Sequence, residues 1–367
     1  SQHQIYPIDI RAGRSILTVV GQGLIHEKGV SSKFLSAISS GGANIEAIAE
    51  GSSELSISTV IEDSQLIAAY RRVYAEFFDR KRQVDLFILG CGNVGAELIR
   101  QIQTQQPYLN QKGISANIRL IANSKYYCDE IKMENEDWRP LLEQSQDILS
   151  QDKLKALLRS GHYVNPTIVD CTCSDEVSAN YANYLDMGFN LVTANKKANS
   201  SDLKSYRNIR QSASRRFRHF FYETNVGAGL PILKTLNSLL CSGDKVHNIT
   251  GVLSGSLSYI LGLVEGGMLM SQAVAQAKEQ GFTEPDPRDD LSGMDVARKI
   301  LILARELGAE LELSDIQLES LLPDSFDASG SPDDFILALS EIDAHFAQLF
   351  EQAKSEQATL KYVASLG

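Results

Sequence analysis

The stretch Val84-Asp-Leu-Phe-Ile-Leu-Gly-Cys-Gly-Asn-Val-Gly95 joins an apolar run to a glycine-rich turn, and residues 96–103 continue as a predicted helix. A Gly-x-Gly-x-x-Gly pattern between a strand and a helix is a much stronger signal than the pattern alone. The first glycine permits the turn, the second lets a pyrophosphate approach, and the third lets the helix pack on the strand. The residues predicted to contact the phosphates are Gly90, Gly92, Asn93, Val94 and Gly95. A tight turn without a ligand is the alternative.

Further strands, predicted at 118–122, 167–170 and 190–193 with a helix over 175–187, complete the pattern of a Rossmann nucleotide-binding domain. The strand at 118–122 ends in Asn-Ser124-Lys125 rather than in the acid that would indicate NAD. A hydroxyl and an ammonium suit a 2′-phosphate, so we predict NADP(H) as the preferred cofactor, with NAD(H) tolerated. Thr172 and Lys196 follow the next two strands, and we expect them to face the nicotinamide ribose and the substrate.

The stretch from Gly281 to Lys299 carries five carboxylates around two prolines and then continues as a predicted helix from residue 292 to residue 307. The prolines keep the first part of this arm extended, and Asp295 and Lys299 lie one helical turn apart. One interpretation is a solvated helix face. The other is a binding site, because five like charges repel one another unless a cation lies among them. That cation could be a substrate ammonium, with a lysine left for proton transfer.

Composition limits the classes of protein that fit. The chain has 367 residues, enough for two or three domains. Its formal charge of −11 argues against a nucleic-acid partner, and no apolar run approaches the length of a membrane span. Five cysteines without zinc-like spacing suit a reducing compartment, so we predict a cytoplasmic protein. Because the chain opens without Met, we expect it to be part of a longer protein.

Residues 15–78 read as a small unit with the order strand, helix, strand, strand, helix, which resembles the ACT domain. The resemblance implies a regulatory module that binds an amino acid at a domain interface, with an effector such as threonine. The loop Gly21-Gln-Gly23 and the helix that opens at Ser31-Ser32 offer N–H groups to a carboxylate. A purely structural dimerisation unit is the alternative.

The run Thr-Glu-Pro-Asp-Pro-Arg-Asp-Asp-Leu-Ser-Gly-Met-Asp-Val-Ala-Arg-Lys, residues 283–299, closely resembles the substrate-binding signature of homoserine dehydrogenases. The resemblance is greatest to those fused behind an aspartokinase. It extends over 83–367 and includes the segments 170–174, 194–196 and a predicted turn at 254–260. The chain departs from the family at Ser256, where threonine is frequent, and at Phe282, where many relatives carry tyrosine.

This resemblance implies reversible reduction of L-aspartate 4-semialdehyde to L-homoserine, a step in threonine and methionine biosynthesis. It implies Lys299 as proton donor, with Lys196 as supporting cation or alternative donor. The substrate-binding residues that it implies are Gly255, Ser256, Glu284, Asp290 and Asp295, with Gly281 beside the cofactor. It further implies a sodium ion held by the Glu223 carboxylate and by the carbonyls of Val226, Ala228 and Leu230, a segment for which a simple tight turn is the alternative.

The predicted fold class is therefore α/β and α+β in three parts. These are an ACT-like segment over 1–82, a Rossmann domain over 83–222, and a mixed α+β substrate domain over 223–367 that lacks its last strands. In the last part we predict a strand at 246–253, helices at 271–279 and 340–354, and a strand starting at 360–363. We expect a homo-oligomer. The rival hypotheses are another amino-acid oxidoreductase and a non-catalytic regulatory fragment.

Overall fold

The structure is a computed structural model that describes residues 10–21, 24, 28–51, 55–78, 82–129, 137–160, 163–283, 286–323 and 325–367. The chain forms two compact units and passes between them several times. The first comprises Ser1–Cys171, Asn183–Val192 and Ser212–Phe220; the second comprises Thr172–Ala182, Thr193–Gln211 and Phe221–Gly367. None of the helices in the described ranges combines the length and apolar character that a membrane crossing requires.

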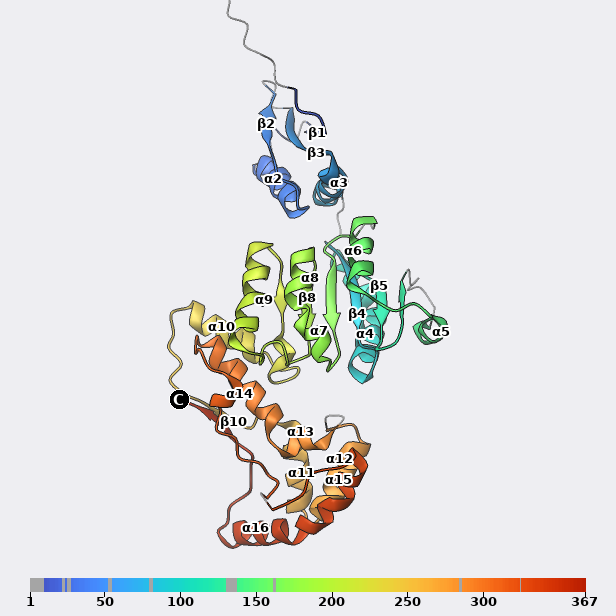
Figure 1. Ribbon diagram of the computed structural model, residues 1–367. Helices are drawn as coiled ribbons and strands as arrows, with labels where there is room; N and C mark the ends of the chain where they lie inside the picture. The colour runs from blue at the N-terminus through green and yellow to red at the C-terminus, as the bar shows by residue number, and fades with distance from the viewer. Residues whose placement is uncertain are drawn as a thin grey trace, which may run out of the picture. The chain divides into compact units, whose positions relative to one another are not determined.

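The first unit begins with a three-stranded antiparallel sheet and two helices (Figure 1). The elements are β1 (Arg14–Val20), α2 (Val30–Ser40), β2 (Ala47–Glu50), β3 (Ser56–Glu62) and α3 (Asp63–Phe78), in the sheet order β1-β3-β2. Residues on alternate positions of β1 and β3 face the helices, and Phe34, Ile38 and Ile61 are fully buried between them. The predicted ACT-like order is confirmed.

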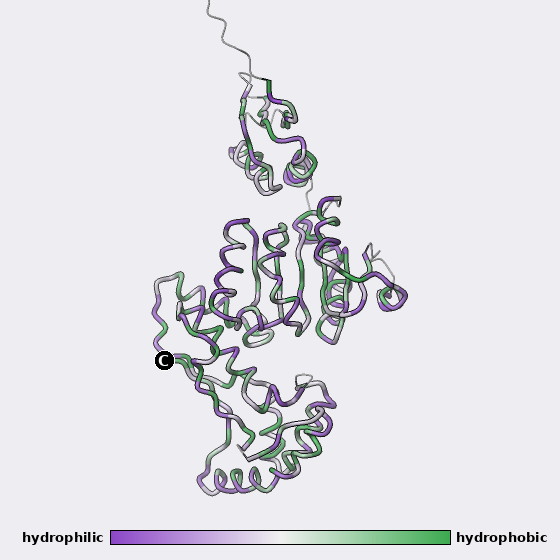
Figure 2. The backbone as a smooth tube through the Cα atoms, in the orientation of Figure 1, coloured by the Kyte–Doolittle hydropathy of each residue, from purple (hydrophilic) through white to green (hydrophobic). Residues whose placement is uncertain are grey.

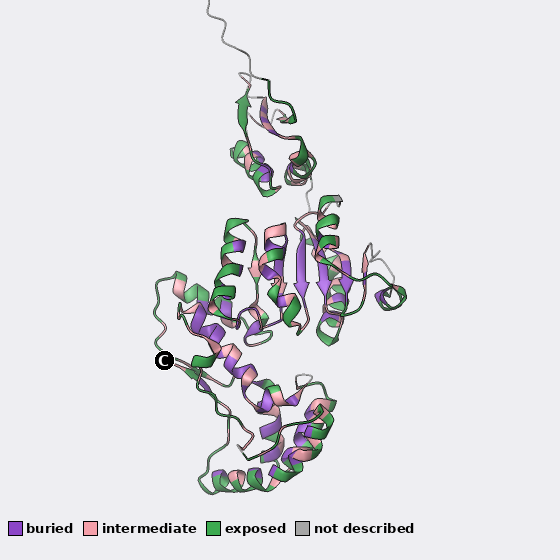
Figure 3. Cartoon of the chain, viewed as in Figure 1, coloured by how far each residue is buried: buried purple, intermediate pink, exposed green. Residues whose placement is uncertain are grey.

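A six-stranded sheet with the order β6-β5-β4-β7-β8-β9 follows. Its strands are β4 (Arg82–Leu89), β5 (Ile114–Ala122), β6 (Tyr127–Asp129), β7 (Thr167–Asp170), β8 (Asn190–Thr193) and β9 (Phe220–Phe221). The central strand β4 pairs in parallel with both β5 and β7, so the strand order reverses on either side of it. Figures 2 and 3 show that the central strands of this sheet are apolar and buried. Ligands of such sheets bind at this reversal, outside the carboxyl ends of the strands.

The helices that belong with this sheet are α4 (Asn93–Gln111), α5 (Trp138–Gln144), α6 (Gln151–Ser160), α7 (Asp175–Ala179), α8 (Tyr181–Met187) and α9 (Leu203–Arg215). The prediction of one helix over 175–187 was wrong, because Asn180 ends α7 and donates its side-chain amide to the Glu176 carbonyl. The helix predicted at 96–103 is longer at both ends. Helix α9 was not predicted, because its run of polar residues conceals its few buried positions.

The second unit is mainly helical. Its elements are η1 (Glu223–Asn225), α10 (Ile232–Cys241), β10 (Ile249–Gly251), α11 (Gly255–Glu265), α12 (Met270–Glu279), α13 (Pro287–Leu291), α14 (Met294–Glu306), η2 (Leu313–Asp315), α15 (Pro332–Ala338), η3 (Leu339–Ile342), α16 (Asp343–Ser355) and β11 (Ala364–Leu366). One core of buried apolar side chains joins α11, α12, α14, α15 and α16, and β10 pairs with β11 in antiparallel fashion.

Several predictions for this unit need correction. The turn predicted at 254–260 is the start of α11, because the Ser254 hydroxyl accepts from the Leu257 N–H and caps the helix. The strand predicted at 246–253 shortens to β10, and the strand expected from residue 360 lies four residues later, where β11 meets β10. The helix predicted at 340–354 is divided between η3 and α16.

Candidate active site

Within the described part of the acidic arm, Asp286 has its partners in the protein itself. Asp286 caps α13 by accepting from the Arg288 N–H, and its carboxylate pairs with the Arg288 guanidinium at 2.6 Å. These hydrogen bonds lower the pKa of Asp286 against the opposing effect of burial. Arg288 also donates to the carbonyls of Ala328 and Gly330. This part of the arm therefore neutralises itself. Glu284, a predicted substrate ligand, lies outside the described residues.

Asp295 lies between two lysine ammonium groups. It is 6% exposed, and its carboxylate meets Lys299 Nζ at 2.7 Å and Lys196 Nζ at 3.0 Å. Burial by itself raises the pKa of Asp295, but the charges and hydrogen bonds of the two lysines outweigh this effect and hold the pKa below its ordinary value. The solvated-face interpretation is therefore wrong, because Asp295 is buried and the residues from Ile300 to Arg305 on α14 are buried as well.

The turn before α14 places Asp295. Gly293 has a φ of 77°, and a Cβ at this position would lie 2.0 Å from Tyr362 Oη. Only glycine combines this backbone conformation with such a close approach.

Lys299 is also tied to the segment that precedes α11. Its Nζ donates to the Leu253 carbonyl at 2.7 Å, and its side chain is 13% exposed. Three residues later, Ser256 Oγ donates to Asp290 Oδ1 at 2.5 Å, and Asp290 is buried. The short segment from Leu253 through Gly255 to Ser256 therefore connects the lysine–aspartate cluster to a second buried carboxylate.

Two side chains that the sequence analysis did not single out hold the loop of Lys196. The buried Asn195 donates to the Ser174 carbonyl at 3.0 Å and accepts from the Lys197 N–H. The Arg305 side chain, fully buried on α14, donates to the carbonyls of Asn199 at 3.0 Å and Ser201 at 2.7 Å. Helix α14 thus carries both the Asp295–Lys299 pair and the clamp on the Lys196 loop.

Sequence patterns gave little chance of finding Arg305. An arginine near the end of a helix usually lies in solvent, and only the packed structure shows that α14 is buried around most of its circumference.

Thr172, a predicted cofactor contact, lies in the loop after β7 and accepts from the Ser174 N–H.

The glycine loop after β4 fits a pyrophosphate. Gly90 has a φ of 92°, and a Cβ on Gly95 would lie 1.9 Å from the Gly90 carbonyl oxygen, so α4 packs directly on the turn. A Cβ on Gly92 would meet nothing within 4 Å. Gly92 caps α4 without a side chain, which leaves first-turn N–H groups of Asn93 and Val94 for a phosphate.

Ser124 and Lys125 are exposed in the turn that follows β5, the parallel neighbour of β4. Asn123 Oδ1 fixes this turn by accepting from the N–H groups of Lys125 and Tyr126, each at 2.7 Å. The side chains of Ser124 and Lys125 therefore lie at the end of β5, where a 2′-phosphate is predicted to bind. Gly281 ends α12 with a φ of 72°, and its predicted cofactor contact remains a prediction.

The cysteines of the glycine-loop region are poor nucleophiles. Burial raises the pKa of both Cys91 and Cys171 to about 12, which keeps the thiols protonated near neutral pH. Within the described ranges no three His, Cys, Asp or Glu side chains are grouped to hold a metal ion.

The residues of the predicted sodium site lie in one turn before α10. Gly227 and Ala228 have φ values of 81° and 49°, so two successive left-handed residues reverse the chain. The Glu223 carboxylate accepts from the Lys234 N–H at 3.0 Å, and the Leu230 carbonyl accepts from the Ile232 N–H at 2.9 Å. These printed contacts of Glu223 and Leu230 are with the protein itself, and the sodium site remains a prediction.

A glycine loop at the reversal point of a parallel sheet is typical of the Rossmann class of nucleotide-binding proteins. Three family models match the chain. "Homoserine dehydrogenase, NAD binding domain" matches residues 90–223, "Homoserine dehydrogenase" matches 231–366, and "ACT domain" matches 17–77. The chain belongs to the homoserine dehydrogenase family and carries an ACT domain.

Among curated relatives, a bifunctional aspartokinase/homoserine dehydrogenase of Haemophilus influenzae is 44% identical over the whole chain, which covers 45% of that protein. The chain spans about half the length of the curated relatives it matches. A Candida auris protein of unknown function, 30% identical, has a TM-score of 0.66 over 78% of this chain and 80% of its own. A hyperthermophilic archaeal homoserine dehydrogenase in complex with NADPH shares the fold, at 24% identity and a TM-score of 0.51 over 61% of this chain and 69% of its own.

Proposed function

We propose that this chain catalyses the reversible interconversion of L-homoserine and L-aspartate 4-semialdehyde with NADP(H). The observation that carries the proposal is the buried carboxylate of Asp295 between Lys196 and Lys299. Reduction of an aldehyde to an alcohol adds one hydride to carbon and one proton to oxygen. The bound nicotinamide supplies the hydride, and the protein supplies the proton and the charge that stabilises the oxygen.

Lys299 is the proton donor in this proposal. Two N–H groups of its ammonium are used in contacts with Asp295 and with the Leu253 carbonyl. These two contacts fix the direction of the third N–H, which is the one proposed to give its proton. Lys196 contacts the other carboxylate oxygen of Asp295. Its role in the proposal is to stabilise the negative charge that grows on the substrate oxygen. In the oxidation direction Lys299, in its neutral form, accepts the proton of the substrate hydroxyl.

The amino-acid end of the substrate requires a carboxylate for its ammonium. Asp290 is buried and bonded to Ser256, and together with Glu284, Gly255 and Asp295 it forms the proposed substrate set. The N-terminus of α11, which begins at Gly255, offers N–H groups to the substrate carboxylate.

The direct test mixes the purified chain with homoserine and NADP and follows formation of the reduced cofactor. Lys299→Ala should lower the rate by ~10²–10⁴-fold, the usual loss for a general acid. Its affinity for the cofactor should change little. Lys204→Ala, an exposed lysine on α9, is the matched control. If Lys299→Ala keeps more than half of the parent activity, Lys299 is not the donor and Lys196 takes its place.

We propose NADP(H) as the preferred cofactor. The support is the exposed Ser124–Lys125 turn at the end of β5. An exposed ammonium–phosphate contact contributes ~1 kcal/mol, so Lys125→Asp should shift the preference toward NAD several-fold. Equal affinities for both cofactors in the parent, unchanged by the substitution, would contradict this assignment.

A sodium ion at Glu223 and the carbonyls of Val226, Ala228 and Leu230 is a further proposal, supported by the reversed turn that these residues share. Sodium should raise the unfolding temperature of the parent more than an equal concentration of tetramethylammonium. The difference should shrink in Glu223→Gln. Equal effects of both cations in the parent would argue for a simple turn.

Three proposals concern partners. We propose that the chain works as the dehydrogenase portion of a bifunctional enzyme with an aspartokinase, as the name of its Haemophilus influenzae relative suggests. The ACT domain would bind an amino-acid effector such as threonine; the predicted contact loop at Gln22 and Gly23 lies outside the described residues. We also propose a homo-oligomer, supported by an exposed apolar row on the outer face of the β1-β3-β2 sheet.

A further inference from the structure

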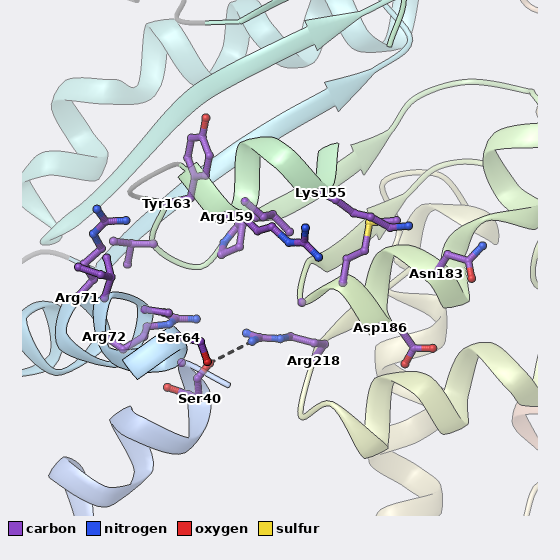
Figure 4. Close-up of a pocket in the computed structure, with 18 of the residues that line it drawn as sticks. Ser40, Ser64, Arg71, Arg72, Lys155, Arg159, Tyr163, Asn183, Asp186 and Arg218 are labelled. Atoms are coloured by element: carbon purple, nitrogen blue, oxygen red, sulfur yellow. Dashed lines mark hydrogen bonds between the residues drawn. The ribbon is translucent and has the colours of Figure 1, made fainter. Parts of the chain in front are cut away.

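A cavity of about 960 Å³ lies within the first unit, between α3, α6 and the segment that carries Arg218. Figure 4 shows that its charged side chains come from these separate elements. The charged residues in the lining are Arg71 and Arg72 from α3, Lys155 and Arg159 from α6, Arg218, and the carboxylate Asp186.

The lining contains five cations and one carboxylate, and of the cations Lys155 also pairs with Asp152 at 3.7 Å, outside the lining. Asp186 already pairs with Arg215 at 3.0 Å and with Arg216 at 3.5 Å, and neither arginine lines the cavity. The whole chain carries a net charge of −11, so the cationic cluster runs against the overall composition. Like charges in a concave site raise one another's energy unless an anion lies among them.

The two most enclosed guanidinium groups have neutral partners. Arg72 Nη1 donates to Asn165 Oδ1 at 2.7 Å, and Arg218 Nη2 donates to the Ser40 carbonyl at 3.1 Å. Arg218 Nε is buried and finds no hydrogen-bond partner among the described residues. Burial, followed by repulsion from Arg72 and Arg216, lowers the pKa of Arg218 to about 10. Neutral acceptors therefore orient both groups; the charge of Glu76 acts favourably on Arg72, whereas the charges that act on Arg218 are those of other arginines.

We propose that this cavity binds a small polyanion with at least two phosphate or carboxylate groups. Guanidinium groups recognise both kinds of acid in a bidentate manner, and the volume is that of a small-molecule site. A zwitterionic amino acid would bring an ammonium into the same cluster and is disfavoured. The ligand would connect α3 of the ACT domain with α6 and Arg218. The proposal does not depend on the dehydrogenase activity.

Calorimetric titration with inorganic pyrophosphate and with citrate, at constant ionic strength and with NADPH present to occupy the glycine loop, tests this inference. The two anions distinguish phosphate from polycarboxylate ligands. The cavity variant is Lys155→Gln combined with Arg159→Gln, because both side chains are exposed and their loss should leave the fold intact. The control is Lys153→Gln, on the same helix but directed at Asp129 and Tyr127.

At least one of the two anions should bind the parent and the Lys153→Gln variant with similar affinity. Each lost ammonium or guanidinium contact should weaken binding by ~10-fold or more, so the double variant should lose ~100-fold. Arg218→Gln, with its unfolding temperature measured alongside, should weaken binding in the same way. The proposal is overturned if neither anion binds, if the cavity variants bind as tightly as the parent, or if threonine binds this cavity while both anions fail.

Discussion

At the scale of single residues, the site depends on one carboxylate shared by two ammonium groups. Asp295 pairs with both lysines, and their charges hold its pKa below the ordinary value although burial alone would raise it. Breaking a buried ion pair by removing one partner commonly costs ~3–5 kcal/mol, because the remaining charge is left uncompensated. Asp295 is therefore both a structural and a functional requirement of the site.

Asp295→Asn should lower the free energy of unfolding by a pH-dependent amount. The pKa of Asp295 is depressed in the folded protein, so its contribution is fully present above the ordinary aspartate value of ~3.9 and is lost as pH falls through the folded value. Denaturant unfolding of parent and variant between neutral and acidic pH measures the difference. A constant gap above pH ~5 that narrows below pH ~4 is expected. A gap that stays constant down to acid denaturation would show that Asp295 acts through its shape and not its charge.

At the scale of elements, the glycine loop assigns different tasks to two glycines that look alike in the sequence. Gly95 leaves no room for a methyl group, because its Cβ would lie 1.9 Å from the Gly90 carbonyl oxygen, whereas Gly92 has open space and a φ of −70°. Gly95→Ala should destabilise the first unit by ~1–3 kcal/mol through overpacking. Gly92→Ala should fold like the parent and bind NADPH more weakly, because its methyl group occupies the approach of the pyrophosphate.

Thermal unfolding with and without NADPH separates the two effects. Gly95→Ala should unfold at a lower temperature even without cofactor. Gly92→Ala should match the parent without cofactor and gain less stability when NADPH is added. Identical behaviour of the two variants would contradict the different roles assigned to the glycines.

Helix α14 carries Lys299 and, through Arg305, holds the loop that follows Lys196. Arg305→Met should leave the carbonyls of Asn199, Ser201 and Leu311 without this donor, and the loss at the buried Asn199 carbonyl should cost ~1–3 kcal/mol. We expect lower stability and a kcat that falls more than the KM for NADP changes, because the Lys196 loop loses its position. Arg207→Met, an exposed arginine on α9, is the control. Parent-like stability and kcat in Arg305→Met would show that the clamp is dispensable.

At the scale of the whole molecule, the periodicity of apolar residues and the sequence motifs predicted most of the architecture. The strand–glycine loop–helix pattern, the order of the ACT domain, and the Asp295–Lys299 spacing depend on local sequence, and the structure agrees with each of them. Other features depend on contacts between distant segments. The pairing of Lys196 with Asp295 and the burial of Arg305 follow from packing that no local pattern reports.

The outer face of the ACT-domain sheet leads to a prediction about assembly. The strand register places Ile16, Val60 and Ala47 in one row across β1, β3 and β2, on the face opposite the buried residues of β3. Ile16 is 70% exposed, and a row of apolar residues on an open sheet face is typical of a contact between subunits. We expect the parent chain to associate through this face, and Ile16→Lys combined with Val60→Lys to shift it toward monomer. Sedimentation over a range of concentrations measures the shift, with Leu337→Lys, an exposed residue of α15, as control. A parent that is monomeric throughout, or a double variant that associates as strongly as the parent, would remove this face as the interface, since a buried apolar contact cannot accept two ammonium groups without a large loss of affinity.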